Sequence, residues 1–134
     1  KAGYREQIRE MLSEAENERM HLMFFIEIAK PNIFERFIVL SSQLIFGIFY
    51  LFMYVCFTRT AHRMIGYFED EAVNSYTEYL DMVKSGKVED TPAPALAISY
   101  YKLPTDAKLS DVIRCVRADE QHHSKTNHEY ANNL

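Results

Sequence analysis

Arg117-Ala118-Asp119-Glu120-Gln121-His122-His123 decides the fold of this chain, together with Glu16-Asn17-Glu18-Arg19-Met20-His21 far upstream. Each stretch contains the pattern Glu-x-x-His, formed by Glu18 with His21 and by Glu120 with His123. Residues three apart lie on one face of a helix, so each stretch can offer a carboxylate and an imidazole to one point in space. One such pattern arises easily by chance. Two of them in charged, helical segments indicate part of the ligand set of a di-iron carboxylate bundle.

Length and composition describe one domain at most. The chain has 134 residues and a net charge of -4, and its basic residues are dispersed, which excludes a nucleic-acid-binding surface. Cys56 and Cys115 lie in apolar segments without metal-ligand spacing, so we expect reduced thiols in the core and no disulfide framework. The first residues begin in or just before a helix, so we expect that no signal or transit peptide is present.

Residues 4–30 form the first predicted helix, because apolar residues recur there at threes and fours. Glu18 lies in the middle of this apolar stripe. A carboxylate on a core-facing stripe is costly without a partner, which favours a metal ligand over a solvated side chain. Pro31 and Asn32 end the helix, since proline lacks a backbone donor and restricts the residue before it.

The second predicted helix, residues 33–57, has no charged side chain after Arg36 and is a transmembrane candidate by length. The neighbouring helices argue against spanning. With a rise of ~1.5 Å per residue, Glu18 lies roughly 20 Å before the turn at Asn32, and Glu69 reaches nearly the same level on the next helix. A spanning helix would place these two carboxylates on opposite sides of a membrane.

We therefore expect residues 37–57 to lie in one leaflet of a membrane, with their apolar side in lipid. A less apolar face would contact the bundle and contains Gln43, Gly47, Tyr50 and Tyr54. An all-buried core helix of a soluble protein is the alternative.

Two more long helices are predicted over residues 59–84 and 107–130, joined by a connector (85–106) that contains a short helix. Glu69 and Tyr76 fall on one face of the first of these helices, whereas Asp70 is expected in solvent. On the second, Glu120 lies roughly 20 Å from the start and so reaches the level of the other two carboxylates. His122 and His128 are expected to be exposed or to support the ligands.

Four stretches resemble the alternative oxidase of mitochondria, and they are closer to it than to the plastid terminal oxidase. They are Asn-Glu-Arg-Met-His-Leu (17–22), Ala-His-Arg-Met-Ile-Gly-Tyr-Phe-Glu-Asp-Glu-Ala-Val-Asn-Ser-Tyr-Thr-Glu-Tyr-Leu (61–80), Pro-Ala-Pro-Ala (92–95) and Arg-Ala-Asp-Glu-Gln-His-His (117–123). The resemblance covers nearly the whole chain. It implies an all-α, ferritin-like di-iron four-helix bundle, of which residues 1–134 form a partial domain without the N-terminal helices.

The resemblance also implies a function. The family oxidises ubiquinol with oxygen at two iron ions, does not pump protons, and lies on the matrix side of the mitochondrial inner membrane as a homodimer. By matching position, Glu18, His21, Glu69, Glu120 and His123 resemble the iron site, and Tyr76 resembles the redox-active tyrosine. The other matches are supporting residues (Asn17, Tyr54 and Asp119), quinol-pocket residues (Phe68, Glu71, Ala72 and Ser75) and dimer contacts (Arg19, Leu22 and Gln43).

Two departures from the family pattern leave alternatives open. The family's helix with a fourth glutamate has no counterpart in this sequence, and Tyr101 stands where the family has tryptophan. An inactive, oxidase-like subunit of a larger respiratory assembly is therefore one alternative. A soluble di-iron protein that stores iron or acts on another substrate is a second, and a single-pass membrane anchor is a third.

Overall fold

Four long helices and one short helix form residues 2–134, the part of the chain that this computed structural model describes, with side chains from residue 5 onward. No β-strand forms within these residues, so the predicted all-α fold is confirmed. The last helix begins two residues later and ends three residues later than predicted. The helices are α1 (Ala2–Ala29), α2 (Ile33–Cys56), α3 (Thr58–Lys84), α4 (Ala95–Tyr101) and α5 (Leu109–Asn133).

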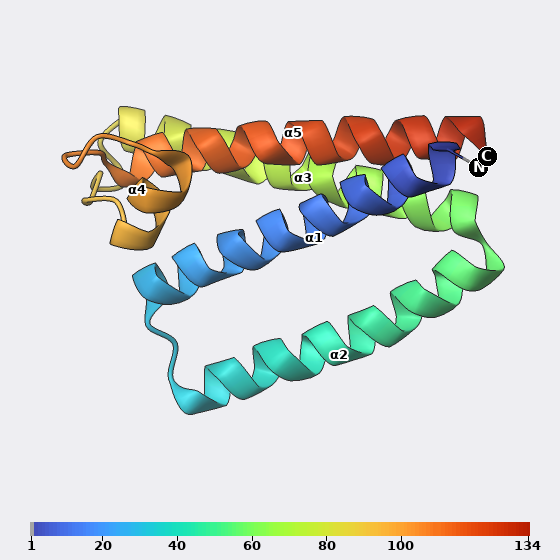
Figure 1. Cartoon of the computed structure of the whole chain (residues 1–134). Helices are drawn as coiled ribbons and strands as arrows, with labels where there is room; N and C mark the ends of the chain where they lie inside the picture. Colours follow the sequence, from blue (N-terminus) through green and yellow to red (C-terminus); the bar gives the residue numbers. More distant parts are fainter. Residues whose placement is uncertain (1) are drawn as a thin grey trace.

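Successive long helices run in opposite directions, so α1 and α3 are parallel to each other and antiparallel to α2 and α5 (Figure 1). Helices α3 and α5 pack side by side along their length, and α1 contacts α5. Helix α4 and its connector lie at the end where α3 leads into α5. Helix α2 stands apart from this group on the side of α1.

Lys30, Pro31 and Asn32 form the turn between α1 and α2. Lys30 has a φ of 46°, and Pro31 follows it outside the helix. Asn32 then starts α2 with a capping box. Its side-chain Oδ1 accepts from the backbone of Phe34 and Glu35 at 3.0 Å each, while a Glu35 carboxylate oxygen accepts from the Asn32 backbone at 2.8 Å. These bonds fix the point at which α2 departs from the bundle.

Helices α3 and α5 approach each other closely at Gly66, where their contacts are polar. Gly66 makes the approach possible, because a Cβ there would lie 2.6 to 2.8 Å from ring atoms of His128. The His128 ring in turn bonds Asp70 (3.0 Å) and Arg63 (2.7 Å). Asp70 also accepts from Ser124, so this exposed carboxylate is bonded rather than simply solvated. The seam fixes the register of the two helices that carry Glu69 and Glu120.

The apolar core lies at the α4 end of the bundle. Its connector is pinned by backbone bonds from Leu109 to Thr91 (2.7 Å) and from Ala93 to Ala107 (2.9 Å). Packing against a fully buried phenylalanine of α1 ties that helix to the start of α5. The core residues are Phe24, Ala97, Leu109, Val112, Ile113 and Val116.

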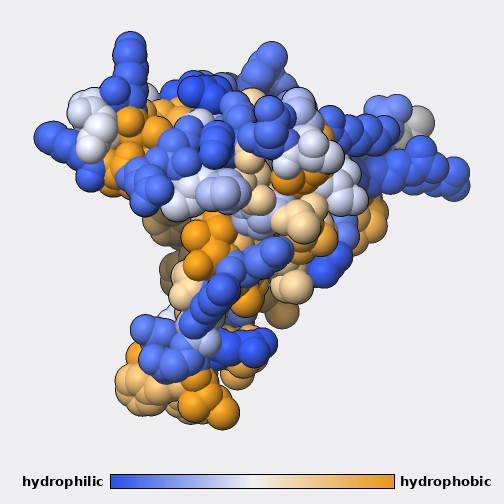
Figure 2. Space-filling view, turned by 90° about the vertical axis from the view of Figure 1, so that its left-hand side faces the viewer, coloured by the Kyte–Doolittle hydropathy of each residue, from blue (hydrophilic) through white to orange (hydrophobic). Residues whose placement is uncertain are grey.

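Helix α2 has no buried residue. Among the described residues it is the one helix long and apolar enough to cross a membrane, judged by length and composition. Figure 2, which views the molecule from the end near the α1–α2 turn, shows apolar side chains at the tip of the lobe below the main body. The expectation of two core thiols is wrong for Cys56, which is exposed because nothing in the described chain covers α2, while Cys115 is half-buried.

Candidate metal centre

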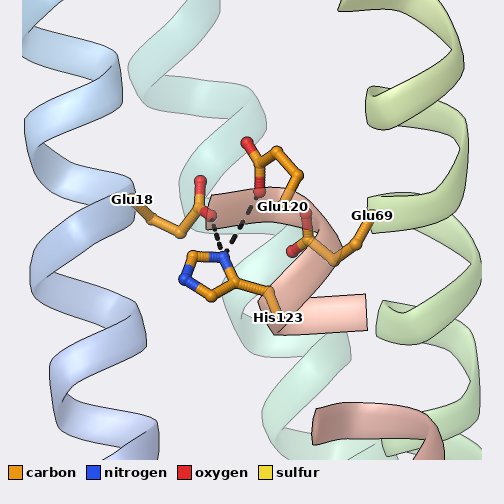
Figure 3. A group of neighbouring side chains, drawn as sticks. All are labelled: Glu18, Glu69, Glu120 and His123. Carbon is orange, nitrogen blue, oxygen red and sulfur yellow. Dashed lines mark ion pairs between the residues drawn. The ribbon is translucent and has the colours of Figure 1, made fainter. Parts of the chain in front are cut away.

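Three carboxylates and an imidazole from three helices converge on one point (Figure 3). Glu18 comes from α1, Glu69 from α3, and Glu120 and His123 from α5, and one ligand atom of each lies within 4.8 Å of the others. The predicted common level of the three carboxylates is therefore confirmed. Segments about a hundred positions apart in the sequence meet here because the helices alternate in direction.

Both Glu-x-x-His histidines turn their Nδ1 atoms toward these carboxylates. His123 Nδ1 lies 2.8 Å from Glu18 Oε1 and 3.3 Å from Glu120 Oε2. His21, which is outside the cluster of four, places Nδ1 3.2 Å from Glu120 Oε1 and 3.7 Å from Glu18 Oε2. His21, Glu120 and His123 are 3 to 4 % exposed, so the pairs that these histidines make with Glu120 lie away from solvent.

Four of these polar atoms are buried and lack a partner at hydrogen-bonding geometry: Glu18 Oε1, Glu120 Oε2, His21 Nδ1 and His123 Nδ1. Buried polar atoms are rarely left unpaired, because each costs about 1–3 kcal/mol. A cation between them would pair all four. Carboxylate oxygens and imidazole nitrogens are ligands that iron accepts, so the residues present fit an iron site.

The titration of the centre follows from this crowding. Burial lowers the pKa of each histidine, but pairing with carboxylates outweighs it and raises the pKa of His21 to about 11 and that of His123 to about 10. Burial and the neighbouring Glu120 raise the pKa of Glu69 to about 9. Burial opposes ionisation of Glu120 as well, yet its pairing with His123 and His21 lowers its pKa.

Asp119 bonds the nitrogen of His21 that points away from the other carboxylates. Its Oδ2 accepts hydrogen bonds from His21 Nε2 at 3.0 Å, from the Tyr101 hydroxyl at 2.6 Å and from Asn17 Nδ2 at 3.0 Å. These bonds outweigh burial and lower the pKa of Asp119. A carboxylate behind a ligating histidine fixes the orientation of the ring, so Asn17 and Asp119 lie where supporting residues would be needed.

Tyr76 lies beside the centre on α3. Its ring stacks on Phe25 of α1, with centroids 6.0 Å apart and an interplanar angle of 10°. Burial and the charges of Glu120 and Glu18 raise its pKa, so the phenol stays protonated. Tyr76 lines one cavity together with Glu18 and His21.

Two cavities flank Glu18, of about 530 Å³ and about 560 Å³. The first lies between α1, α2 and α3 and is lined mainly by apolar side chains, among them Phe46, Ile65 and Phe68. The Glu18 side chain is 42 % exposed, in contrast to the expectation of a core-facing carboxylate. The described chain thus covers the centre from α5 and leaves it open on the side of these cavities.

The remaining predicted residues are not all brought to the centre. Of the predicted quinol residues, Phe68 lines the first cavity, whereas Glu71 and Ser75 are exposed and Ala72 is half-buried. Leu22, Gln43 and Arg19 line the second cavity, where α1 faces α2. His122 is exposed and pairs with Glu10 at 2.8 Å.

The contacts of Tyr54 are with α1 and α3. Its hydroxyl contacts Met11 Sδ at 3.8 Å, and its ring lies edge-on to His62 with centroids 5.6 Å apart. Tyr54 lies near the end of α2, which is followed by α3 from Thr58, whereas Glu69 lies eleven residues further along α3.

Sequence reasoning missed a buried polar chain next to the centre. Asn127 Oδ1 lies 2.9 Å from His62 Nδ1, and its Nδ2 donates to Glu14 Oε1 at 2.7 Å and to the His123 carbonyl at 3.0 Å. Burial raises the pKa of Glu14. Glu14 precedes Glu18, and Asn127 follows His123, by one helical turn, so the spacing places each beside a predicted ligand but does not show that the two side chains meet.

A comparison with protein families decides the relationship, because the model described as alternative oxidase matches residues 3–132. The chain belongs to the alternative oxidase family. Proteins similar to it include ubiquinol oxidase 1b, mitochondrial, of Oryza sativa subsp. japonica, which is 54 % identical over 121 residues. Ubiquinol oxidase 1c, mitochondrial, of Arabidopsis thaliana is 51 % identical over 127 residues.

The matches cover 90 % and 95 % of this chain but only 36 % and 38 % of those two relatives. The chain therefore spans little more than a third of the length of the alternative oxidases it matches.

Proposed function

We propose that the full-length protein is a ubiquinol oxidase that transfers electrons from ubiquinol to oxygen, giving water at a di-iron centre without pumping protons. The observation that carries this proposal is the convergence of Glu18, Glu69, Glu120 and His123, with the Nδ1 atom of His21 also directed at Glu120 and Glu18. The relatives named above are ubiquinol oxidases, which supplies the substrate class. Glu18, His21, Glu69, Glu120 and His123 would hold the iron.

Iron, when bound, supplies the redox chemistry that carboxylates and imidazoles lack. The protein residues would do the rest. Asp119 holds the His21 ring through Nε2, so the Nδ1 atom keeps its direction toward the centre. Tyr76, protonated and stacked on Phe25, is placed to give up an electron and a proton beside the centre.

A fourth carboxylate would complete the site from outside the described chain. Three carboxylates and two histidines are one carboxylate short of the ligand set of a di-iron bundle. The cavities next to Glu18 lie on the side that α5 does not cover, and a helix from the rest of the protein would fit there. Phe68, Glu71, Ala72 and Ser75 would then face that helix and contribute to a quinol pocket.

Helix α2 would attach the protein to the matrix side of the mitochondrial inner membrane without crossing it. One face of α2 is apolar and 62 to 88 % exposed; it contains Ile33, Phe37, Leu40, Leu44, Ile48, Leu51 and Val55. Spacings of three and four place these residues on one side of the helix, as expected for an interfacial helix. A dimer would use Arg19, Leu22 and Gln43 on the face between α1 and α2.

The main test is iron analysis and quinol-dependent oxygen uptake by the full-length protein, compared with the variant Tyr76→Phe. We expect the variant to keep its iron and to lose quinol oxidation, because phenylalanine cannot give up a proton with its electron. Tyr79→Phe is the matched control, since Tyr79 packs against the apolar core on the same helix. If the Tyr76→Phe variant still oxidised quinol, Tyr76 would not be the redox-active tyrosine. If the wild-type protein bound no iron, the alternative of an inactive, oxidase-like subunit would be favoured.

Membrane attachment is tested by flotation with liposomes. Ile48→Asp combined with Leu51→Asp should weaken binding more than about tenfold, since burying each side chain contributes about 1.5–3 kcal/mol. Met82→Asp is the control, because Met82 is an exposed apolar residue of α3. Unchanged flotation of the double variant would contradict an interfacial α2.

A further inference from the structure

Tyr101 is placed between the candidate metal centre and a second tyrosine. Its hydroxyl donates to Asp119 Oδ2 at 2.6 Å and lies 3.1 Å from His21 Nε2. His21 in turn points its other nitrogen at Glu120 and Glu18. A phenol bonded to a carboxylate can lose its proton and an electron together, since the acceptor for the proton is already in place.

Tyr100 continues this path to the surface. The rings of Tyr100 and Tyr101 meet edge to face with centroids 4.9 Å apart. Tyr100 is 39 % exposed and accepts a hydrogen bond from Asn17 Nδ2 at 3.0 Å. It lines a polar cavity of about 200 Å³ between α1 and α5, together with Glu10 and His122. Its lining comes from α1, α4 and α5, whereas the two cavities that flank Glu18 are lined mainly from α1, α2 and α3.

The fully buried Phe24 closes the other side of both rings, at centroid distances of 5.7 Å to Tyr100 and 5.6 Å to Tyr101. Phenylalanine has no ionisable hydrogen and is much harder to oxidise than tyrosine. Of the aromatic rings in contact with Tyr101, Tyr100 is therefore the one that can accept an oxidising equivalent.

We infer that Tyr101 and Tyr100 form a relay that carries oxidising equivalents from the metal centre to the protein surface. The inference rests on the proposed function, because oxygen acting at the iron site supplies the oxidant. The relay would act when quinol is absent and the oxidised centre has no other electron donor. It is distinct from Tyr76, which lies on α3 beside the cavity that Glu18 lines.

Each step balances. Tyr101 passes one electron to the oxidised centre and its phenolic proton to Asp119, which leaves a neutral tyrosyl radical. Tyr100 then passes an electron to Tyr101, which takes its proton back from Asp119. Tyr100 releases its own proton to water in the polar cavity. A soluble one-electron donor such as ascorbate, with a proton from solvent, restores Tyr100.

The test uses full-length, iron-loaded protein, reduced with stoichiometric dithionite and mixed with oxygen without quinol in the presence of a nitroso spin trap. Peptide mass spectrometry locates the trapped tyrosyl radicals. We expect several-fold more adduct on Tyr100 than on Tyr67, although Tyr67 is 62 % exposed and so more accessible. In Tyr101→Phe, the adduct on Tyr100 should fall to the level of Tyr67. Equal labelling in the wild type, or undiminished labelling in the variant, overturns the relay.

Tyr100→Phe provides a second measurement, since it leaves every bond to Asp119 in place. The tyrosyl signal in electron paramagnetic resonance should then persist several-fold longer, because Tyr101 has lost its neighbouring donor. An unchanged lifetime overturns the relay even if Tyr101→Phe disturbs folding. Iron content and quinol-dependent oxygen uptake are measured on the same samples. An active oxidase without the labelling pattern contradicts the relay alone, whereas a protein without iron contradicts the proposed function as well.

Discussion

Helices α2 and α5 are nearly equal in length, with 24 and 25 residues, but they differ in how many of their residues are buried. The apolar α2 buries no residue. The polar α5 buries ten, including Glu120, His123, Ser124 and Asn127. Half of the buried residues of α5 are polar and half are apolar, so this helix serves both the polar centre and the apolar core, whereas the apolar surface of α2 is left for a different environment.

The largest effect is expected on α5. Glu120→Ala should abolish iron binding by the full-length protein, and it should destabilise the metal-free protein by about 3–5 kcal/mol, because His21 and His123 lose their buried partner. Iron analysis and urea unfolding measure the two effects. The neighbouring Gln121→Ala is the control, since Gln121 is exposed and should change stability by no more than about 0.5 kcal/mol. Two irons per chain in Glu120→Ala would refute the assignment.

A smaller difference is expected between Gly66 on α3 and Gly47 on α2 when each is replaced by alanine. Gly66→Ala should cost about 1–3 kcal/mol, because the new methyl group meets the His128 ring that bonds Asp70 and Arg63. Gly47→Ala on α2 meets nothing within 4 Å and should stabilise by up to about 1 kcal/mol through helix propensity. Thermal unfolding compares them. Equal shifts would mean that the seam of α3 and α5 is no tighter than the surroundings of α2.

A separate expected effect is a dependence of the stability on pH. Glu69, His123 and His21 have folded-state pKa values raised to about 9, 10 and 11, so each binds a proton more tightly in the folded protein. Their contribution to stability is complete below the unfolded pKa and is lost as pH rises through the folded value. The metal-free protein should therefore melt at lower temperature as pH rises from about 6.5 to about 10.

Glu120 and Asp119 have lowered pKa values and act in the opposite direction, but only below about pH 4.5. Residues 37–58 of α2 and its junction carry no charged side chain, so flotation should not change over the same range. A melting temperature that rises with pH would show that the three raised groups are not paired as described.

Helical periodicity and the rise per residue were enough to predict the all-α fold and the meeting of Glu18, Glu69 and Glu120. Both depend on local geometry, which sequence spacing encodes directly. The exposure of Glu18 and Cys56 could not be predicted, because a pattern tells which face of a helix is apolar but not what covers it.

The polar partners of the centre were harder to predict than its ligands. Asn127 and Glu14 meet only because α1 and α5 cross at one angle, and no motif records that angle. The bond from Tyr101 to Asp119 depends in the same way on where α4 sits against α5.

The junction of α2 and α3 consists of Phe57 alone. Its N–H closes α2 on Met53 at 2.7 Å, and its carbonyl opens α3 by accepting from Ala61 at 2.9 Å. A junction of one residue whose N–H and C=O are both hydrogen-bonded restricts the angle between the two helices. Glu69 follows Thr58 by eleven residues, about 16 Å along α3. If α2 lies in the membrane surface as proposed, its position would therefore set the distance of the Glu69 carboxylate from that surface.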